Sequence, residues 1–335
     1  MTDLKPTDST FAIAAQRQPS VWTRVRRSQW MNHAGLFIVV LLVFAATAFG
    51  SDAFLKPTTL ANTAEQVSWL AVIAAGLTLL MTAGGVDFSL GGIAGVGSAI
   101  LGQLISGGTD PVLAVVIMLV VATLIGALNG VIVTFIGVEP FVVTLATATI
   151  LAGAQVAVLG GGRSAKTGDT FTWLHNGDLF GMPYLVILAI IVMLIIGLMM
   201  RYTVFGRNVF AIGGNEEVAK LSGIPISRVK MLLYTLNGLL AGIAGIMLLA
   251  NVGTASTSLG GLNLELQAVA AVVIGGTALA GGYGTMIGTV LGVMLLGLVG
   301  KALGLLSVDS SFQQVSVGAV LLIAAIVGHL QKRRR

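Results

Sequence analysis

Long apolar runs that carry almost no charge repeat along most of this 335-residue chain. A helix needs about 20 such residues to cross the hydrocarbon core of a bilayer. Hydrophobic residues make up 56% of the chain and charged residues 9%, which is too little charge to cover the surface of a soluble domain of this length. The sequence therefore predicts an all-α membrane protein, a polytopic bundle of about ten transmembrane helices.

The predicted spans lie at residues 34–50, 58–82, 89–106, 111–136, 141–159, 183–200, 231–252, 265–280, 284–303 and 312–330. The first run follows basic residues and ends near Ala46-Thr47-Ala48, which resembles a signal-peptide cleavage site. We interpret it as a retained helix, because a long polar segment precedes it and its length approaches that of a span. Residues 1–32 are then a cytoplasmic tail, and residues 33–335 form the transmembrane domain.

Glycine, with 45 residues, is the other unusual feature of the composition. In lipid, glycine serves close helix–helix contacts and breaks in helices that lie inside a bundle. Double glycines therefore predict broken or short helices near residues 84–92 and 265–284.

The distribution of Lys and Arg predicts the orientation. Residues 1–32 contain five of them, residues 201–230 another five and the last four residues four, whereas only Lys56, Arg163, Lys166 and Lys301 lie elsewhere. With an internal N-terminus and ten spans, the large group faces the cytoplasm and the four others face outside, as the positive-inside rule requires. Both termini are thus predicted to be cytoplasmic, with a large cytoplasmic loop at 201–230 and a large outer loop at 160–182.

The cytoplasmic loop contains a short helix with clear start and stop signals. Asn215 is a good N-cap, and Glu216 and Glu217 lie in the first turn, where the helix dipole favours anions. Gly223 suits the position after the C-cap, and Pro225 prevents continuation.

The faces of this helix carry a second signal. Glu216 and Lys220 are spaced for an i,i+4 ion pair, and Val218 and Leu221 share one side. Two helical turns do not persist alone in water, so the helix needs a packing partner. That partner is either the protein's own bundle or a cytoplasmic protein, and physical reasoning leaves both open.

The same loop resembles the coupling-helix region of ABC importer permeases of the ribose, xylose, arabinose and autoinducer-2 group. Those permeases carry G-R-x-x-x-A-I-G-G-N followed by A-x-x-x-G-I, and this chain matches at Gly206, Arg207, Ala211, Ile212, Gly213, Gly214, Asn215, Ala219, Gly223 and Ile224. Residues 84–91, GGVDFSLG, are similar to the family's G-G-I-D-L-S-V-G, with Phe88 and Leu90 as departures. Further matches are Asn129-Gly130, Pro140-Phe141, Thr144-Leu145, Val273 to Gly276, Gly281-Gly282 and Gly284-Thr285. The N-terminal tail is not covered.

The resemblance implies a permease subunit of a bacterial plasma (inner) membrane importer, paired with a second permease subunit as a homodimer or a heterodimer. Cytoplasmic ATP-binding subunits would dock on the coupling helix, and an extracytoplasmic sugar-binding protein would deliver a monosaccharide. The docking residues would be Asn215, Glu216, Glu217, Lys220, Leu221 and Gly223. The sequence agrees that this chain has no ATPase of its own, since no Lys is followed by Ser and Lys166-Thr167 lacks the preceding glycine of a P-loop.

Asp87 is the most conspicuous candidate for the transport pathway. A carboxylate in the middle of a span costs about 2.5–3.5 kcal/mol, so it is either functional or outside the hydrocarbon. One interpretation is that Asp87 caps a helix beginning near Phe88 and holds the break in shape. The other is that it contacts the substrate in a cavity formed by the broken helix.

The remaining pathway candidates are Ser89, Asn129, Thr144, Asn237, Glu265 and Gln267. Asn129 and Asn237 each lie in an apolar span, where an amide either bonds to a neighbouring helix or lines a polar route. Glu265 and Gln267 are placed near the outer end of the eighth span, as part of an outer vestibule or as solvated end residues.

Other function classes stay open at this point. A related ABC permease for branched-chain amino acids or nucleosides fits the same pattern. A proton- or sodium-coupled secondary transporter would use Asp87, Glu139 or Glu265, and a membrane scaffold would show no substrate dependence. With 3 histidines and no cysteine, we predict neither a metal site nor a cofactor. The net charge of +5 reflects the orientation bias, so we predict no nucleic-acid partner.

Overall fold

The computed structural model describes residues 29–309 together with residues 312, 315, 318–319 and 322. Within this part, 7 helices are long and apolar enough to cross a membrane, and two shorter apolar helices accompany them. The predicted all-α polytopic bundle is confirmed. The last predicted span, 312–330, lies mostly outside the described residues.

The helices in chain order are α2 (Gln29–Gly50), α3 (Pro57–Thr82), α4 (Leu90–Ser106), α5 (Pro111–Val131), the π-helix η1 (Ile132–Ile136), α6 (Pro140–Val158), α7 (Thr172–Asn176), α8 (Tyr184–Tyr202), α9 (Val204–Gly214), α10 (Glu216–Leu221), α11 (Ile226–Val252), α12 (Leu262–Ile274) and α13 (Met286–Leu305). The strands are β1 (Ala165–Lys166), β2 (Asp178–Leu179), β3 (Met182–Pro183) and β4 (Thr254–Ala255). β1 pairs with β4 and β2 with β3, both antiparallel.

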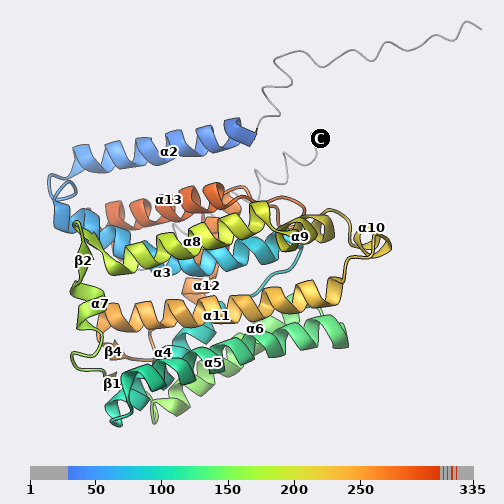
Figure 1. Cartoon of the computed structure of the whole chain (residues 1–335). Coiled ribbons are helices and arrows are strands. Elements are labelled where there is room, and N and C mark those ends of the chain that lie inside the picture. The colour runs from blue at the N-terminus through green and yellow to red at the C-terminus, as the bar shows by residue number, and fades with distance from the viewer. Residues whose placement is uncertain (1–28, 310–311, 313–314, 316–317, 320–321, 323–335) are drawn as a thin grey trace, which may run out of the picture.

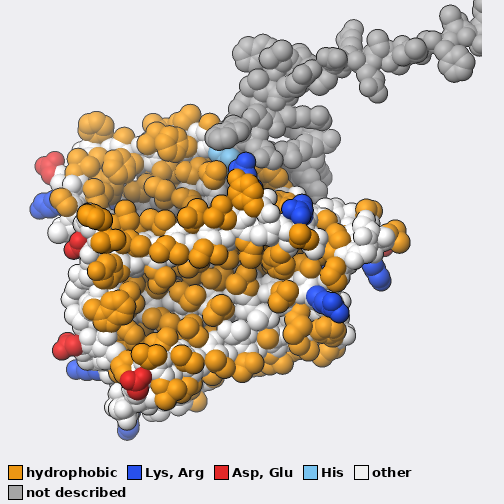
Figure 2. Space-filling model, viewed as in Figure 1, with side chains coloured by type: hydrophobic (Ala, Val, Ile, Leu, Met, Phe, Trp, Pro, Cys, Tyr) orange, Lys and Arg blue, Asp and Glu red, His pale blue; other side chains and the backbone are white. Residues whose placement is uncertain are grey.

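Figure 1 shows the long helices side by side, with α9 and α10 at one end of the bundle and α7, β1, β2 and β4 at the opposite end. The two predicted large loops, 201–230 and 160–182, therefore emerge at opposite ends. α3 and α11 lie inside the bundle. In their most apolar 18-residue stretches 78% and 67% of the residues are buried, against 22% in α6. α11 packs against α3, α4 and α5. Hydrophobic side chains cover most of the face shown in Figure 2, as a surface in contact with lipid requires.

Glycine allows a close helix contact in this core, between α5 and α11. A Cβ placed on Gly126 would lie 2.8 Å from the Cα of Gly238, so a larger side chain would separate the two helices. This is the small-residue packing expected of helices in lipid.

Two interruptions divide the bundle as predicted. The first runs from residue 83 to residue 89, between α3 and α4, with Gly84 at φ +84°. The second surrounds α12, which is only 13 residues long. Residues 253–261 lead into α12 and residues 275–285 follow it, and both segments are largely non-helical. α12 is thus shorter than the predicted span 265–280 and begins three residues earlier.

The loop at residues 201–230 holds one helix that was not predicted, α9. Its first turn is capped by Thr203, whose hydroxyl accepts a hydrogen bond from the backbone N–H of Gly206 at 3.1 Å. Asn215 then separates α9 from α10 in extended conformation, with φ −162°.

Candidate functional site

Asp87 lies in the break between α3 and α4 with only 1% of its surface exposed. Its Oδ1 accepts hydrogen bonds from the backbone N–H of Ser89 at 2.8 Å and from the Ser89 hydroxyl at 2.6 Å. Ser89 is itself the N-cap of α4, which begins at Leu90. Asp87 therefore shapes the turn that leads into the cap, a common role of Asp, and it does not cap a helix starting near Phe88.

Asn129 joins this break to two other helices. Its Nδ2 donates to the Ser89 hydroxyl at 2.9 Å, and its Oδ1 accepts from the hydroxyl of Thr147 on α6 at 2.7 Å. Thr147, Asn129, Ser89 and Asp87 thus form one chain of hydrogen bonds that crosses α6, α5 and the start of α4. Bonds of this kind between helices contribute about 0.6–2 kcal/mol each in lipid.

Glu265 lies in the first turn of α12 and is likewise 1% exposed. Its Oε1 accepts a hydrogen bond from the backbone N–H of Gly92, in the first turn of α4, at 3.0 Å. The interpretation of Glu265 as a solvated residue at a span end is therefore wrong. A carboxylate at this position also faces the positive end of the α4 dipole, which favours an anion.

The non-helical segment 253–261 explains why Glu265 is buried. This segment runs back along α4, from Ala255 beside Gly102 to Gly261, whose N–H donates to the Gly91 carbonyl at 2.9 Å. Eleven residues of α4 span about 16 Å. The segment thus carries the chain well inside the bundle before α12 begins.

Several backbone polar groups of this segment have hydrogen-bond partners, as irregular backbone at membrane depth requires. β4 pairs with β1, which belongs to the loop at residues 160–182. Gln155 of α6 donates from Nε2 to the carbonyls of Ser256 at 2.9 Å and Leu259 at 3.0 Å. Gln155 is therefore a structural residue that the sequence did not single out.

The three remaining pathway candidates also lie outside the hydrogen-bond chain. Thr144 is buried and donates to the carbonyl four residues earlier in its own helix at 2.8 Å. Asn237 does the same at 2.9 Å, and its Oδ1 lies 2.6 Å from the position a Cβ would take on Gly76 of α3. Asn237 thus packs at the crossing of α11 and α3. Gln267 is half-buried on α12.

At the cytoplasmic end predicted above, α10 has both expected caps. Asn215 accepts a hydrogen bond from the backbone N–H three residues later at 3.1 Å. At the other end, Gly223 with φ +80° donates to the Lys220 carbonyl at 3.0 Å, and Ile224 donates to the Ala219 carbonyl at 3.1 Å. This pair of bonds is a complete Schellman motif, so six residues form a helix with two closed ends.

The side of α10 that faces away from the bundle carries two exposed apolar side chains. Val218 is 57% exposed and Leu221 is 88% exposed, while Ala219 is buried at 2%. Glu217 is also exposed. The bundle therefore supports α10 through one face and leaves a leucine almost wholly uncovered.

Glu216 fixes α10 to α11. Lys230 Nζ donates to both carboxylate oxygens of Glu216, at 2.7 and 2.8 Å. Lys220, the partner expected from helical spacing, is replaced by Lys230. The turn between α10 and α11 brings Lys230 to the Glu216 carboxylate.

The end of α9 meets the two interruptions through glycine backbones. A Cβ on Gly213 would collide with the carbonyl of Thr82 and would lie 2.5 Å from the N of Gly282. A Cβ on Gly281 would lie 2.9 Å from the Cα of Gly84 and 3.0 Å from the carbonyl oxygen of Gly213. We call this contact the glycine joint; it consists of Gly84, Gly213, Gly281 and Gly282.

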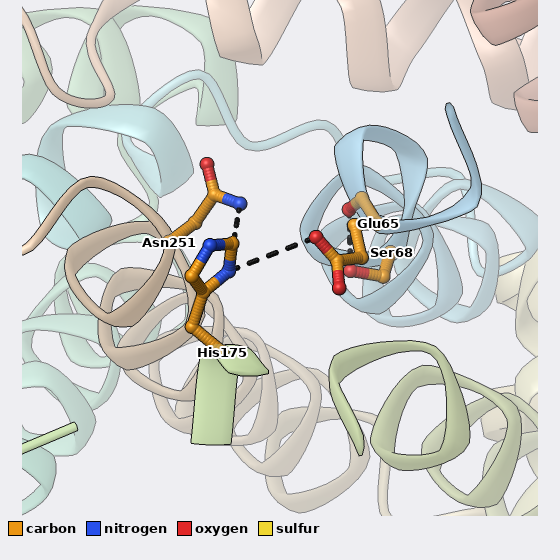
Figure 3. Close-up of polar contacts among 4 residues, drawn as sticks. All are labelled: Glu65, Ser68, His175 and Asn251. Atoms are coloured by element: carbon orange, nitrogen blue, oxygen red, sulfur yellow. Dashed lines mark hydrogen bonds and ion pairs between the residues drawn. The ribbon is translucent and has the colours of Figure 1, made fainter. Parts of the chain in front are cut away.

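A separate polar cluster lies at the opposite end of the bundle (Figure 3). His175 of α7 points between α3 and α11, with Nδ1 3.7 Å from Oε2 of Glu65 and 3.4 Å from Nδ2 of Asn251. Ser68 donates to the backbone carbonyl of Glu65 at 2.6 Å. These contacts hold α7 against the ends of two buried helices, α3 and α11.

Comparison with known proteins gives one family. Residues 59–325 match the family described as the permease component of branched-chain amino acid transport systems. The chain is 37% identical to the ribose import permease protein of Bacillus subtilis, over 88% of this chain and 90% of that protein. It is 30% identical to the L-arabinose ABC transporter permease protein of Azospirillum brasilense, over 98% and 95%, and 32% identical to the fructose import permease protein of Bifidobacterium longum, over 86% and 85%. No solved structure matches this chain.

Proposed function

The chain belongs to the family of permease components of branched-chain amino acid transport systems, and we propose that it is the membrane subunit of an ATP-binding cassette importer that carries a monosaccharide. The sugar assignment is supported by the relatives, which are named as permeases for ribose, arabinose and fructose. The family description, branched-chain amino acids, is the alternative cargo.

The observation that carries the importer assignment is the exposed apolar face of α10. A residue 88% exposed such as Leu221 contributes nothing to the stability of this chain by burial. The helix is nevertheless capped at both ends and tied to α11. Rigid presentation of an apolar side chain is typical of a surface that docks into a groove of a partner.

The proposed partner at α10 is a cytoplasmic ATP-binding subunit. Asn215, Glu216 and Gly223 would hold the helix, and Glu217, Lys220 and Leu221 would contact the partner. ATP hydrolysis then takes place on the other chain, since the sequence has no P-loop. An extracytoplasmic binding protein would deliver the sugar, and a second permease subunit, identical or homologous, would complete the complex. Both termini would lie in the cytoplasm, on the side of the Lys- and Arg-rich loop.

Purification of the tagged chain from its native membrane tests the proposal. An ATP-binding subunit should copurify, and the reconstituted complex should take up ribose, arabinose or fructose when ATP and the loaded binding protein are supplied. Uptake of solute by the purified chain alone, driven by an ion gradient, would contradict it. ATP-dependent uptake of leucine but of no sugar would keep the importer and replace the cargo.

A further inference from the structure

Two buried carboxylates meet at the start of α4. Asp87 binds the N–H of Ser89 through Oδ1, and Glu265 binds the N–H of Gly92 through Oε1. Both side chains are 1% exposed. Among the residues that the structure describes, Oδ2 of Asp87 and Oε2 of Glu265 have no hydrogen-bond partner.

Each carboxylate is therefore half satisfied. One oxygen stabilises the first turn of α4, while the other remains an acceptor in a place that water reaches poorly. A buried acceptor without a donor is unfavourable, so the arrangement favours whatever supplies hydrogen-bond donors there. The chain of hydrogen bonds from Thr147 through Asn129 to Ser89 fixes the orientation of the Asp87 carboxylate.

The location is the meeting point of two discontinuous helices. α4 starts after the break at residues 83–89, and α12 starts after the non-helical segment 253–261. In transporters, such helix starts inside the bundle commonly form the substrate site, and a free helix N-terminus there attracts an anionic group of the substrate. In this chain the start of α4 already holds two carboxylates of the protein.

We propose that Asp87 and Glu265 form a polyol subsite of the translocation pathway, in which Oδ2 and Oε2 accept hydrogen bonds from hydroxyl groups of a neutral monosaccharide. This inference rests on the proposed function and adds a reason for the cargo. Two carboxylates would repel the carboxylate of an amino acid. The hydroxyl groups of a sugar carry no charge and can donate hydrogen bonds to both carboxylates. Both side chains are enclosed in this structure, so the sugar contacts them when α4 and α12 separate during the transport cycle.

The test uses the complete importer in proteoliposomes, with the copurifying ATP-binding subunit and the binding protein at saturation. D-ribose, L-arabinose, D-fructose and L-leucine are the probes. The variants Asp87→Asn and Glu265→Gln keep side-chain volume and the oxygen that binds α4, but they replace the free oxygen by an NH₂ donor. The matched control is Glu139→Gln, which makes the same chemical change on an exposed side chain at the start of α6.

The measured quantity is the amount of sugar transported per ATP hydrolysed. Loss of a charged acceptor in the pathway should lower this ratio about tenfold in either variant, while the stimulated ATPase rate stays within about twofold of the wild type. The control should keep both values. An unchanged ratio, or a parallel fall in transport and ATPase, would overturn the subsite and leave Asp87 and Glu265 as positioning residues for α4.

Failure of the proposed function gives a different result, because the wild type would then move leucine or no probe at all. If an amide variant does not assemble, infrared difference spectra of the wild-type importer with and without sugar decide the question. Sugar binding should shift carboxyl or carboxylate bands, and a spectrum without such a shift would overturn the subsite.

Discussion

The backbone N–H of Gly92 and the Oε1 of Glu265, 173 residues apart in the sequence, are joined by a hydrogen bond of 3.0 Å. This bond links the first turns of the two short helices α4 and α12. The bond depends on the small size of Gly91, the residue before Gly92, because Gly91 lies directly against the Glu265 side chain and the carbonyl of Gly261.

Gly91→Ala should therefore damage the protein at this junction. The new Cβ would lie 2.8 Å from Cγ of Glu265 and would collide with the Gly261 carbonyl, so the segment 253–261 would have to move. Overpacking of this kind costs about 1–3 kcal/mol. We expect a lower unfolding temperature in detergent and a loss of uptake. Gly153→Ala is the matched control, because nothing lies within 4 Å of its Cβ position and alanine favours a helix. Equal unfolding temperatures for both variants would contradict the packing described.

Asn129→Leu should destabilise the bundle more than Thr147→Val does. The first change removes the donor to Ser89 and the acceptor of Thr147, while the second removes a single bond at the end of the chain. The expected loss is about 1–3 kcal/mol for Asn129→Leu and about 1 kcal/mol or less for Thr147→Val. Equilibrium unfolding of the purified variants in mixed micelles measures both, and the reverse order would show that Asn129 is not the central member.

Leu221→Arg, alone or with Glu217→Lys, should remove the ATP-binding subunit from the purified complex. Leu221 is 88% exposed and adds almost no buried surface to the permease. The membrane expression and the unfolding temperature of the variant should therefore remain those of the wild type. Leu179→Arg, on an exposed residue of the β2–β3 hairpin at the opposite end of the bundle, is the control and should keep the subunit. If the Leu221→Arg variant retained the subunit at wild-type stoichiometry, α10 would not be part of the docking surface.

Lys230→Gln should loosen α10, whereas Lys220→Gln should have little effect. Among the described residues, only Lys230 bonds to Glu216, and that pair is partly exposed, with side-chain exposures of 25% and 54%. A pair of this exposure contributes at most about 1 kcal/mol and is screened by salt. Proteolysis of the 201–230 loop at low and high ionic strength measures the effect. The Lys230 variant should be cut faster than the wild type at low salt only, and faster cutting of the Lys220 variant instead would favour the i,i+4 pair.

Prediction from the sequence succeeded where the signals are local. The caps of α10 follow from Asn215 and Gly223, and the break after α3 follows from its double glycine, because each depends on a few neighbouring residues. Apolar runs of sufficient length placed the long helices for the same reason. α9 was missed, since its start at Thr203 has no apolar periodicity before it and the double glycine at its end indicated a loop.

The candidate site was predicted less completely, because its contacts are long-range. Asp87, Ser89 and Asn129 were selected as separate polar residues. The structure joins them in one chain of hydrogen bonds, which ends at Thr147, a residue with no local signal. Glu265 was placed too near the surface, since a pattern of apolar runs assumes that each chain segment between spans is a solvated loop. Residues 253–261 instead pack along α4, held by Gln155 and Gly91 from elsewhere in the chain.

The glycine joint has a mechanical consequence. At this place the end of α9, the end of α3 and the segment after α12 touch main chain to main chain, and no rotamer lies between them to absorb a displacement. A displacement of α10 that moves α9 would therefore reach the break between α3 and α4 and the segment that follows α12 at once. These two segments would shift together, because no flexible side chain lies between them.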